Sequence, residues 1–293
     1  MSTVQPKNVY ILGTAYCGST LLGNALNAHS SVAFAGEVSR LPAFGVGEAW
    51  TVCPLCSAQE IDCPIWTPEF IEQVSEAGPS KALDLFREAA QVPVIVDGSK
   101  HVSWLRKVHG HAPVPSNTFV LIAVRSPFAF VNSTQRRDHW QVWFGANVWR
   151  DTIFDMLRCV GDLGLPHGIV RYEDFARDPE AGLKRICAWL GLDFEASMLR
   201  FWEAAVHGLG GNAGAYVWYD GFRKGGEYAN DTDRKVAETY QERTFGGWSD
   251  DKWRQQLGPK EIKLILNTPG LADMCSLVGY DVRELLVGPG SPE

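Results

Sequence analysis

The chain has 293 residues, a formal net charge of −7 and a sequence pI of about 5.5. With 45% hydrophobic and 21% charged residues it resembles an ordinary globular protein, and it is long enough to bury a large core. The acidic balance argues against a general nucleic-acid binder, although a small anionic ligand needs only a local cluster of cations.

Neither the start of the chain nor its apolar runs predict a membrane or secretory segment. Residues 1–7 are polar and lack the apolar core of a signal peptide, and no apolar run approaches the ~18 residues of a spanning helix. Seven cysteines are an odd and sparse set, which fits a reducing compartment. We therefore expect a cytoplasmic protein.

The first predicted elements are a strand, a glycine-bounded loop and a helix. An apolar run at 9–12 predicts a buried strand, and apolar residues at helical spacing follow at 21–26. The loop between them, from Gly13 to Thr20, would point backbone N–H groups and the positive end of the helix at one anion. Its glycines are spaced as in the Walker A motif, but Ser19 stands where that motif has Lys. The loop therefore predicts a nucleotide-phosphate site without the triphosphate chemistry of an NTPase.

The next distinctive stretch is a Cys-rich insert at about 50–66. It contains Cys53, Cys56 and Cys63, a C-x-x-C pair followed by a third cysteine. Free thiols, a disulfide and a bound zinc all stay open, because a structural zinc normally has four ligands and no fourth Cys or His lies nearby in the sequence. We expect a local cap here, followed by a helical stretch at 68–90 that is broken at Gly78-Pro79.

Two further apolar runs predict strands that end in polar residues. The run at 92–100 ends in Ser99 and Lys100. The run at 119–124 is typical of a central parallel strand and leads into Arg125, with Ser133 eight residues later on the following helix. Ligand groups of open α/β sheets lie at the carboxyl ends of strands, and a guanidinium can hold a phosphate through two hydrogen bonds. We therefore expect a second anion site at this junction.

The rest of the chain predicts a long helix at 141–160, a strand and turn from 168, a helix at 179–190, and a long polar stretch to about 247 before the closing helices. No internal repeat or low-complexity linker interrupts the chain.

Taken together, these motifs resemble the sulfotransferases that use 3′-phosphoadenosine 5′-phosphosulfate (PAPS), in the style of the bacterial small-molecule and tyrosylprotein enzymes. The family's first loop has the pattern [KR]-[SC]-G-[ST]-T-x-L, which residues 16–22 match except that Tyr16 replaces the cation. The family's 3′-phosphate motif, Leu-Val-Arg-[Asp/Asn]-Pro…Ser, has the spacing of Arg125 and Ser133. The resemblance covers nearly the whole chain. It implies one domain over 1–293 with a P-loop NTPase-like three-layer α/β/α fold around a central parallel sheet.

The resemblance also implies where PAPS or its product PAP binds. The first loop would hold the 5′-phosphosulfate, Arg125 and Ser133 the 3′-phosphate, and Tyr172 would lie beside the adenine. A lid loop at about 207–247 would fold over the cofactor; Ala215 replaces the family's Arg there, and Arg223 or Lys224 would restore the charge. The implied cofactor-binding residues are Tyr16, Cys17, Gly18, Ser19, Thr20, Leu21, Arg125, Ser133, Tyr172, Gly211, Asn212, Arg223 and Lys224.

Three residues are candidates for catalysis. In the family the Glu after a Gly, here Glu37, is the proposed base that takes the acceptor proton. Lys100 would replace the cation missing at Tyr16, and His139 is the second candidate for the base. The reaction needs no metal, because transfer depends mainly on positioning and charge stabilisation.

The acceptor is expected to be a small molecule with a hydroxyl or amine. The eleven Trp residues serve either core packing or an aromatic wall for the acceptor, and such a wall suits an apolar or ring-bearing molecule as well as a sugar. Neither nucleic acid nor a membrane span is expected, and a homodimer stays open. A non-catalytic PAP/PAPS-binding protein is the alternative that Tyr16 and Ala215 favour. A small-molecule kinase is a third, which the missing Walker Lys disfavours.

Overall fold

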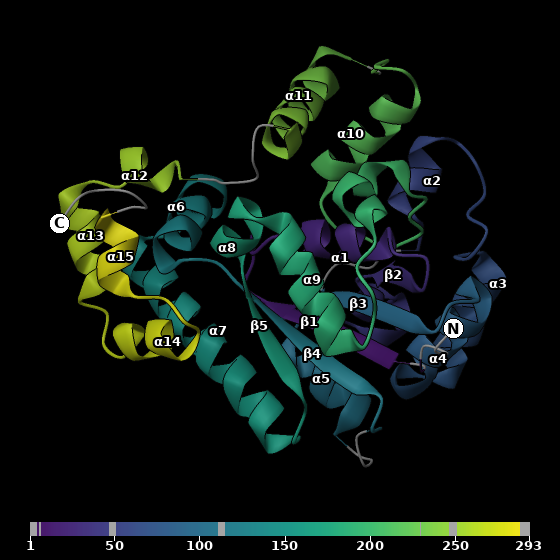
Figure 1. The fold of residues 1–293 in the computed structure, drawn as a ribbon, viewed down its shortest axis with the longest axis horizontal. Helices are drawn as coiled ribbons and strands as arrows, with labels where there is room; N and C mark the ends of the chain where they lie inside the picture. The colour runs from purple at the N-terminus through teal and green to yellow at the C-terminus, as the bar shows by residue number, and fades with distance from the viewer. Residues whose placement is uncertain are drawn as a thin grey trace.

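The computed structural model describes residues 5, 7–46, 51–110, 115–228, 230–245 and 251–287. Its centre is a five-stranded parallel sheet in the order β2-β3-β1-β4-β5. Figure 1 shows this sheet in the middle of the molecule with helices packed around it. The predicted three-layer α/β fold with a central parallel sheet is confirmed. The strands are β1 Lys7–Gly13, β2 Val32–Gly36, β3 Val94–Lys100, β4 Thr118–Val124 and β5 His167–Arg171.

The connections between strands place helices on both faces. Parallel strands need right-handed crossovers, so a connection to one side of the sheet and a connection to the other side lie on opposite faces. Helix α1 (Ser19–Asn27) leads from β1 across β3 to β2, whereas α5 (Val102–His109) leads from β3 across β1 to β4. Helix α7 (Val142–Asp162) packs on α5, and α9 (Pro179–Leu190) packs with α1 against η4 (Ala196–Glu203).

The remaining helices surround this core. Among them, α3, α4, α6, α7 and α9 confirm the predicted helical stretches and their breaks. The further elements are η1 Val38–Arg40, η2 Pro42–Phe44, α2 Pro54–Ala58, α3 Pro68–Ala77, η3 Pro79–Lys81, α4 Ala82–Ala90, α6 Pro127–Asp138, α8 Tyr172–Arg177, α10 Ala213–Arg223, α11 Asp231–Phe245, α12 Trp253–Gln256, α13 Pro259–Leu266, α14 Leu271–Leu277 and α15 Val282–Val287.

Three expectations about elements need correction. Residues 32–36 form a strand that the sequence did not predict, so the run at 92–100 is the third strand and not the second. Tyr172 opens helix α8 and does not lie in a turn. The stretch expected as a lid loop at 207–247 is largely helical, since α10 and α11 occupy most of it. Each helix begins directly after an asparagine, Asn212 before α10 and Asn230 before α11, and the two helices pack on each other.

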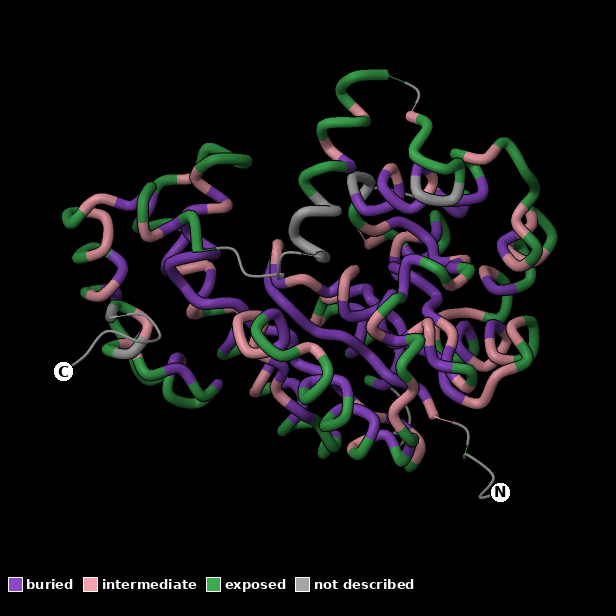
Figure 2. The backbone as a smooth tube through the Cα atoms, turned by 45° about the horizontal axis from the view of Figure 1, so that its top comes forward, coloured by how far each residue is buried: buried purple, intermediate pink, exposed green. Residues whose placement is uncertain are grey.

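The central strands β3, β1 and β4 of the sheet are deeply buried. Figure 2 shows the strands as buried traces through the centre, while α11 is exposed at the rim. Val9, Ile95, Val120 and Leu121 of the sheet are fully buried. In the part of the chain that the structure describes, no helix is long and apolar enough to cross a membrane.

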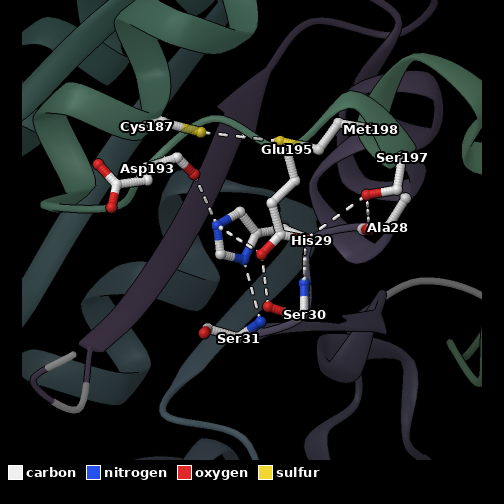
Figure 3. Close-up of polar contacts among 9 residues, drawn as sticks. All are labelled: Ala28, His29, Ser30, Ser31, Cys187, Asp193, Glu195, Ser197 and Met198. Carbon is white, nitrogen blue, oxygen red and sulfur yellow. Dashed lines mark hydrogen bonds and ion pairs between the residues drawn. The ribbon is translucent and has the colours of Figure 1, made fainter. Parts of the chain in front are cut away.

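A polar cluster around the buried His29 ties the end of α1 to the segment after α9 (Figure 3). His29 Nε2 lies 2.8 Å from the carbonyl oxygen of Asp193, and His29 Nδ1 accepts a hydrogen bond of 3.0 Å from the N–H of Ser31. The proton of the imidazole therefore lies on Nε2. The Glu195 carboxylate accepts hydrogen bonds from the backbone N–H and the hydroxyl of Ser30. Although partial burial opposes it, these bonds hold the pKa of Glu195 below its ordinary value. The cluster fixes two segments 164 positions apart and has a structural role.

Candidate active site

The carboxyl ends of the five strands meet at one edge of the sheet. Register pairs Leu12 with Lys100 across β1 and β3, and Gly13 with Ala123 across β1 and β4. Val124 pairs with Arg171 across β4 and β5. The predicted site residues therefore lie at the ends of neighbouring strands, along the same edge of the sheet. They are the first loop after β1, Lys100 at the end of β3, Arg125 after β4 and Tyr172 after β5.

The loop after β1 opens α1 with its N–H groups uncapped. Gly18 is the N-cap with φ +85°, and no side chain caps the first turn. A helix start of this kind offers several N–H donors and a positive dipole end to an anion. Ser19 is 6% exposed, and burial raises the pKa of the Cys17 thiol, which Lys100 partly offsets. Cys17 thus packs inward and keeps its thiol neutral.

Gly18 also lies against an aromatic ring. A Cβ added at Gly18 would approach Tyr172 Cδ2 to 2.7 Å, which real Cβ atoms do not do. The ring of Tyr172 therefore covers the loop at the glycine. Tyr172 therefore contacts the loop that was predicted to bind the 5′-phosphosulfate.

Arg125 lies between the first loop and the helix that carries Ser133. Its Nη1 donates to Ser133 Oγ at 3.3 Å and to the carbonyl oxygen of Tyr16 at 3.1 Å. Its guanidinium lies 5.2 Å from the centre of the Tyr172 ring, and the residue is 6% exposed. The Trp149 indole N–H donates to the Arg125 carbonyl at 2.8 Å, which fixes the backbone at this position. The structure thus brings together the two predicted 3′-phosphate residues and joins them to the first loop.

Tyr16 occupies the position of the family's cation in a left-handed conformation, with φ +60°. Its hydroxyl donates to Asp138 Oδ1 at 2.8 Å. Burial and this carboxylate raise the pKa of Tyr16. Arg137 lies 5.0 Å from the centre of the Tyr16 ring, so a positive charge approaches the loop from α6 even though Tyr16 carries none.

Glu37 follows β2 and lies between two cations. Lys100 Nζ donates to Glu37 Oε1 at 2.5 Å, and Arg40 Nε donates to Oε2. Glu37 is only 4% exposed, so it is not the surface carboxylate of a solvated ion pair. Its backbone N–H donates to the carbonyl oxygen of Leu209 at 2.6 Å, in a short parallel bridge between Gly36 and Leu209. Glu37, the predicted base, and Lys100, the cation predicted to replace the one missing at Tyr16, are thus joined by a direct hydrogen bond.

Behind Glu37 lies a buried carboxylate that the sequence did not single out. Asp97 accepts hydrogen bonds from Trp104 Nε1 at 2.5 Å and from the backbone N–H and hydroxyl of Ser99. Ser99 Oγ in turn accepts from the N–H of Ser39 at 3.0 Å. Burial raises the pKa of Asp97 to about 6, against the lowering effect of these hydrogen bonds. This network holds the chain after β2 to the end of β3.

The segment after β5 brings one more predicted residue to the loop. Gly211 has φ +106°, and a Cβ there would lie 3.5 Å from Thr20 Cγ2 and 2.9 Å from the hydroxyl of Tyr216. Gly211 therefore lies next to Thr20 in the first turn of α1. The neighbouring Tyr216 was not predicted. Its hydroxyl is buried without a hydrogen-bond partner among the described residues, and burial, Cys53 and Glu37 raise its pKa.

Other predicted residues lie elsewhere or are not placed. Lys224 is exposed and donates to Asp220 at 2.8 Å, one helical turn earlier. The Arg223 side chain lies outside the described residues. His139 is exposed and ends α6 with φ +57°. The backbone places Leu21 in the first turn of α1 and Asn212 just before α10.

Sequence reasoning missed Asp97, Tyr216 and the Leu209 bridge. Asp97 directly follows the apolar residues 94–96 of β3, and a carboxylate at that position of a buried strand could have been recognised as a group that needs partners. Nothing local marks Leu209, because its partner Gly36 lies far away in the sequence, and nothing in the sequence shows that the Tyr216 hydroxyl is buried.

Solved structures of other proteins have a similar fold. No family model matches the chain, and no curated protein matches it either. Among solved structures, the sulfotransferase domain from the olefin synthase of Synechococcus PCC 7002 superposes with a TM-score of 0.58 at 20% identity, covering 96% of this chain and 98% of that chain. A sulfotransferase domain from the curacin biosynthetic pathway gives a TM-score of 0.58 at 16% identity, covering 95% and 99%. The chain therefore has the fold of sulfotransferase domains over nearly its whole length.

Proposed function

We propose that this protein is a sulfotransferase that moves the sulfuryl group of PAPS to a hydroxyl or amine of a small molecule. The observation that carries the proposal is the convergence of two anion-binding groups on one sheet edge. The uncapped start of α1 supplies one, the Arg125–Ser133 pair supplies the other, and Tyr172 contacts both. PAPS has two separated anionic groups on one adenosine, and it would supply an activated sulfuryl group.

The residues at this edge fit such a donor. Gly18 leaves the loop backbone open where a side chain would collide with Tyr172. Arg125 is fixed by Trp149 and lies with Ser133 on the α6 side of the loop, where a guanidinium fork can hold the 3′-phosphate. Tyr172 offers its ring to the adenine between the two anion groups. Gly211, against Thr20, closes the site from the α10 side.

The Glu37–Lys100 pair would serve the transfer itself. Lys100 Nζ, now bonded to Glu37, would turn to an oxygen of the sulfuryl group and stabilise the charge that builds up there. Glu37, released from Lys100, would take the proton of the attacking hydroxyl. The bond between sulfur and the leaving phosphate oxygen breaks as the bond to the acceptor oxygen forms.

Calorimetric titration with PAP and then with ATP tests the donor. Micromolar binding of PAP with little or no binding of ATP is the expected result, because the loop lacks the Lys that a triphosphate needs and Arg125 suits a 3′-phosphate. ATP binding with indifference to PAP would contradict the proposal and favour a kinase.

The role of Glu37 is tested by Glu37→Gln, which keeps the shape and removes the basic oxygen. We expect PAP affinity to stay within about twofold, and transfer of ³⁵S from labelled PAPS to a panel of phenols, alcohols and amines to fall ~10²–10⁴-fold. If Glu37→Gln transferred the sulfuryl group as fast as the wild type, Glu37 would be excluded as the base. PAP binding with no transfer by the unmodified protein to any acceptor would favour the non-catalytic binding protein.

A further inference from the structure

The Cys-rich insert comes together with a histidine that is distant in the sequence. Cys53, Cys56 and Cys63 lie beside His207, and their sulfur and nitrogen donor atoms are all within 4.8 Å of one another. His207 is 144 positions from Cys63 along the chain. The sequence left the fourth ligand unidentified, and the fold supplies it.

The distances fit a tetrahedral metal. Cys56 Sγ lies 3.4 Å and Cys63 Sγ lies 3.8 Å from His207 Nδ1. Zinc bonds of about 2.3 Å to sulfur and 2.0–2.1 Å to nitrogen at tetrahedral angles place sulfur and nitrogen about 3.6 Å apart. The observed separations bracket that value.

The chemistry of the donors points to zinc among the common metals. Three thiol sulfurs and one imidazole are soft and borderline ligands that suit zinc, whereas magnesium and calcium need oxygen ligands. Among the described residues, which include all seven cysteines, no disulfide forms. Four protein ligands leave no open position, which is the arrangement of a structural site.

The surroundings hold the ligands in place. The backbone N–H of Trp66 donates to Cys63 Sγ at 3.3 Å, and the Trp66 indole N–H donates to the carbonyl oxygen of His207 at 2.7 Å. Cys53 and Cys56 are 2% and 3% exposed. Hydrogen bonds of this kind orient metal ligands, and a buried site keeps water from competing for the metal.

We propose that Cys53, Cys56, Cys63 and His207 bind one structural Zn²⁺ that fastens the Cys-rich insert to the segment before α10. That segment continues through Leu209, whose carbonyl accepts from the Glu37 N–H, to Gly211 beside Thr20. The metal would therefore hold the backbone that supports both the candidate base and the first turn of α1. The proposal does not depend on the sulfotransferase reaction.

Metal analysis of the purified full chain tests the site directly. Protein made in zinc-supplemented medium without a metal-affinity tag should contain about one zinc per chain, and X-ray absorption should show three sulfur and one nitrogen ligands. His207→Ala and Cys63→Ser should lose most of the zinc. His207→Cys should retain it, because four thiolates also bind zinc. His167→Ala, which changes an exposed histidine outside the cluster, and Cys275→Ala, a buried cysteine outside it, are matched controls that should keep the full content.

Stability supplies a second readout. Removal of zinc with a strong chelator should lower the Tm by several degrees, and zinc but not magnesium should restore it. The proposal would be overturned by wild-type protein without zinc or by full zinc in both His207→Ala and Cys63→Ser. A thiol count in denaturant two short of the seven cysteines would also overturn it where peptide mapping places the disulfide among Cys53, Cys56 and Cys63.

Discussion

Gly18 meets two requirements that no other residue type meets together. Its φ of +85° disfavours any residue with a Cβ, and the space where that Cβ would lie is taken by the Tyr172 ring. The glycine of the phosphate loop could be predicted from its spacing. Its contact with Tyr172 could not, because the two residues are 154 positions apart and only the sheet register brings them together.

Gly18→Ala should lower PAP affinity by about 10- to 100-fold. The left-handed backbone costs an Ala ~1–2 kcal/mol, and the new methyl must displace Tyr172 from the loop. Calorimetric titration measures the affinity. Gly164→Ala is the matched control, since Gly164 also has a positive φ but nothing within 4 Å of the added Cβ. It should lose stability and keep its PAP affinity, and an equal affinity in both variants would contradict the contact.

Asp97 predicts a pH dependence of stability. Its carboxyl has a pKa of about 6 in the fold, raised by burial from 3.8, so the folded protein keeps a proton that the unfolded chain has lost. The contribution of Asp97 is therefore full below about pH 4 and is lost as the pH rises through 6. In Asp97→Asn this dependence disappears. Urea unfolding from pH 4 to 7 should show the free-energy difference between wild type and variant shrinking as the pH rises.

The exposed Asp273→Asn provides the comparison for that experiment, and its curve should run parallel to the wild type. Parallel curves for Asp97→Asn as well would show that Asp97 is ionised in the fold throughout this range.

At the scale of elements, apolar runs predicted the strands at 9–12, 92–100 and 119–124 and the helices that follow them. Strand β2 was not predicted, because Val32–Gly36 is short and its last two residues are small. Its role comes from its neighbours: β3 pairs along one edge, and Leu209 bridges to Gly36 on the other. The stretch with α10 and α11 was expected as a loop because α10 begins in a glycine-rich segment and α11 is largely polar. The packing of the two helices on each other could not be predicted from the sequence.

Gly36→Ala tests whether this edge positions Glu37. Gly36 has φ +79°, and a Cβ would collide with the backbone of Leu209, so the bridge that receives the Glu37 N–H must open. We expect the rate of sulfuryl transfer to fall at least about tenfold while PAP affinity changes less than about twofold. The reason is that Arg125 and Ser133, which would bind the 3′-phosphate, follow β4 and not the edge strand β2. Gly45→Ala, with φ +65° and open space, should leave transfer unchanged. Loss of PAP binding in Gly36→Ala would mean that the edge supports the donor site instead.

At the scale of the whole molecule, the parallel sheet explains which features of the site could be predicted from the sequence and which could not. Motifs at strand ends predicted Arg125, Ser133, Lys100 and the first loop, because parallel strands deliver their carboxyl ends to one edge. Which of these residues pair was not predictable. The bond between Lys100 and Glu37 spans 63 positions and depends on β2 lying beside β3. The position of His207 beside the three cysteines was not predictable either, because 144 positions separate it from Cys63.

The central claim is that Arg125 binds the 3′-phosphate of an adenosine cofactor, and one set of calorimetric titrations tests it most directly. PAP and adenosine 5′-monophosphate differ by that phosphate, so each is titrated into wild type, Arg125→Ala and the control Arg158→Ala, which removes an exposed arginine of α7. We predict that wild type and Arg158→Ala bind PAP at least about 100-fold more tightly than the monophosphate, and that Arg125→Ala loses most of this preference while its affinity for the monophosphate changes little. An unchanged preference for PAP in Arg125→Ala would contradict the assignment of the 3′-phosphate site, and equal binding of both nucleotides by the wild type would contradict the sulfotransferase proposal itself.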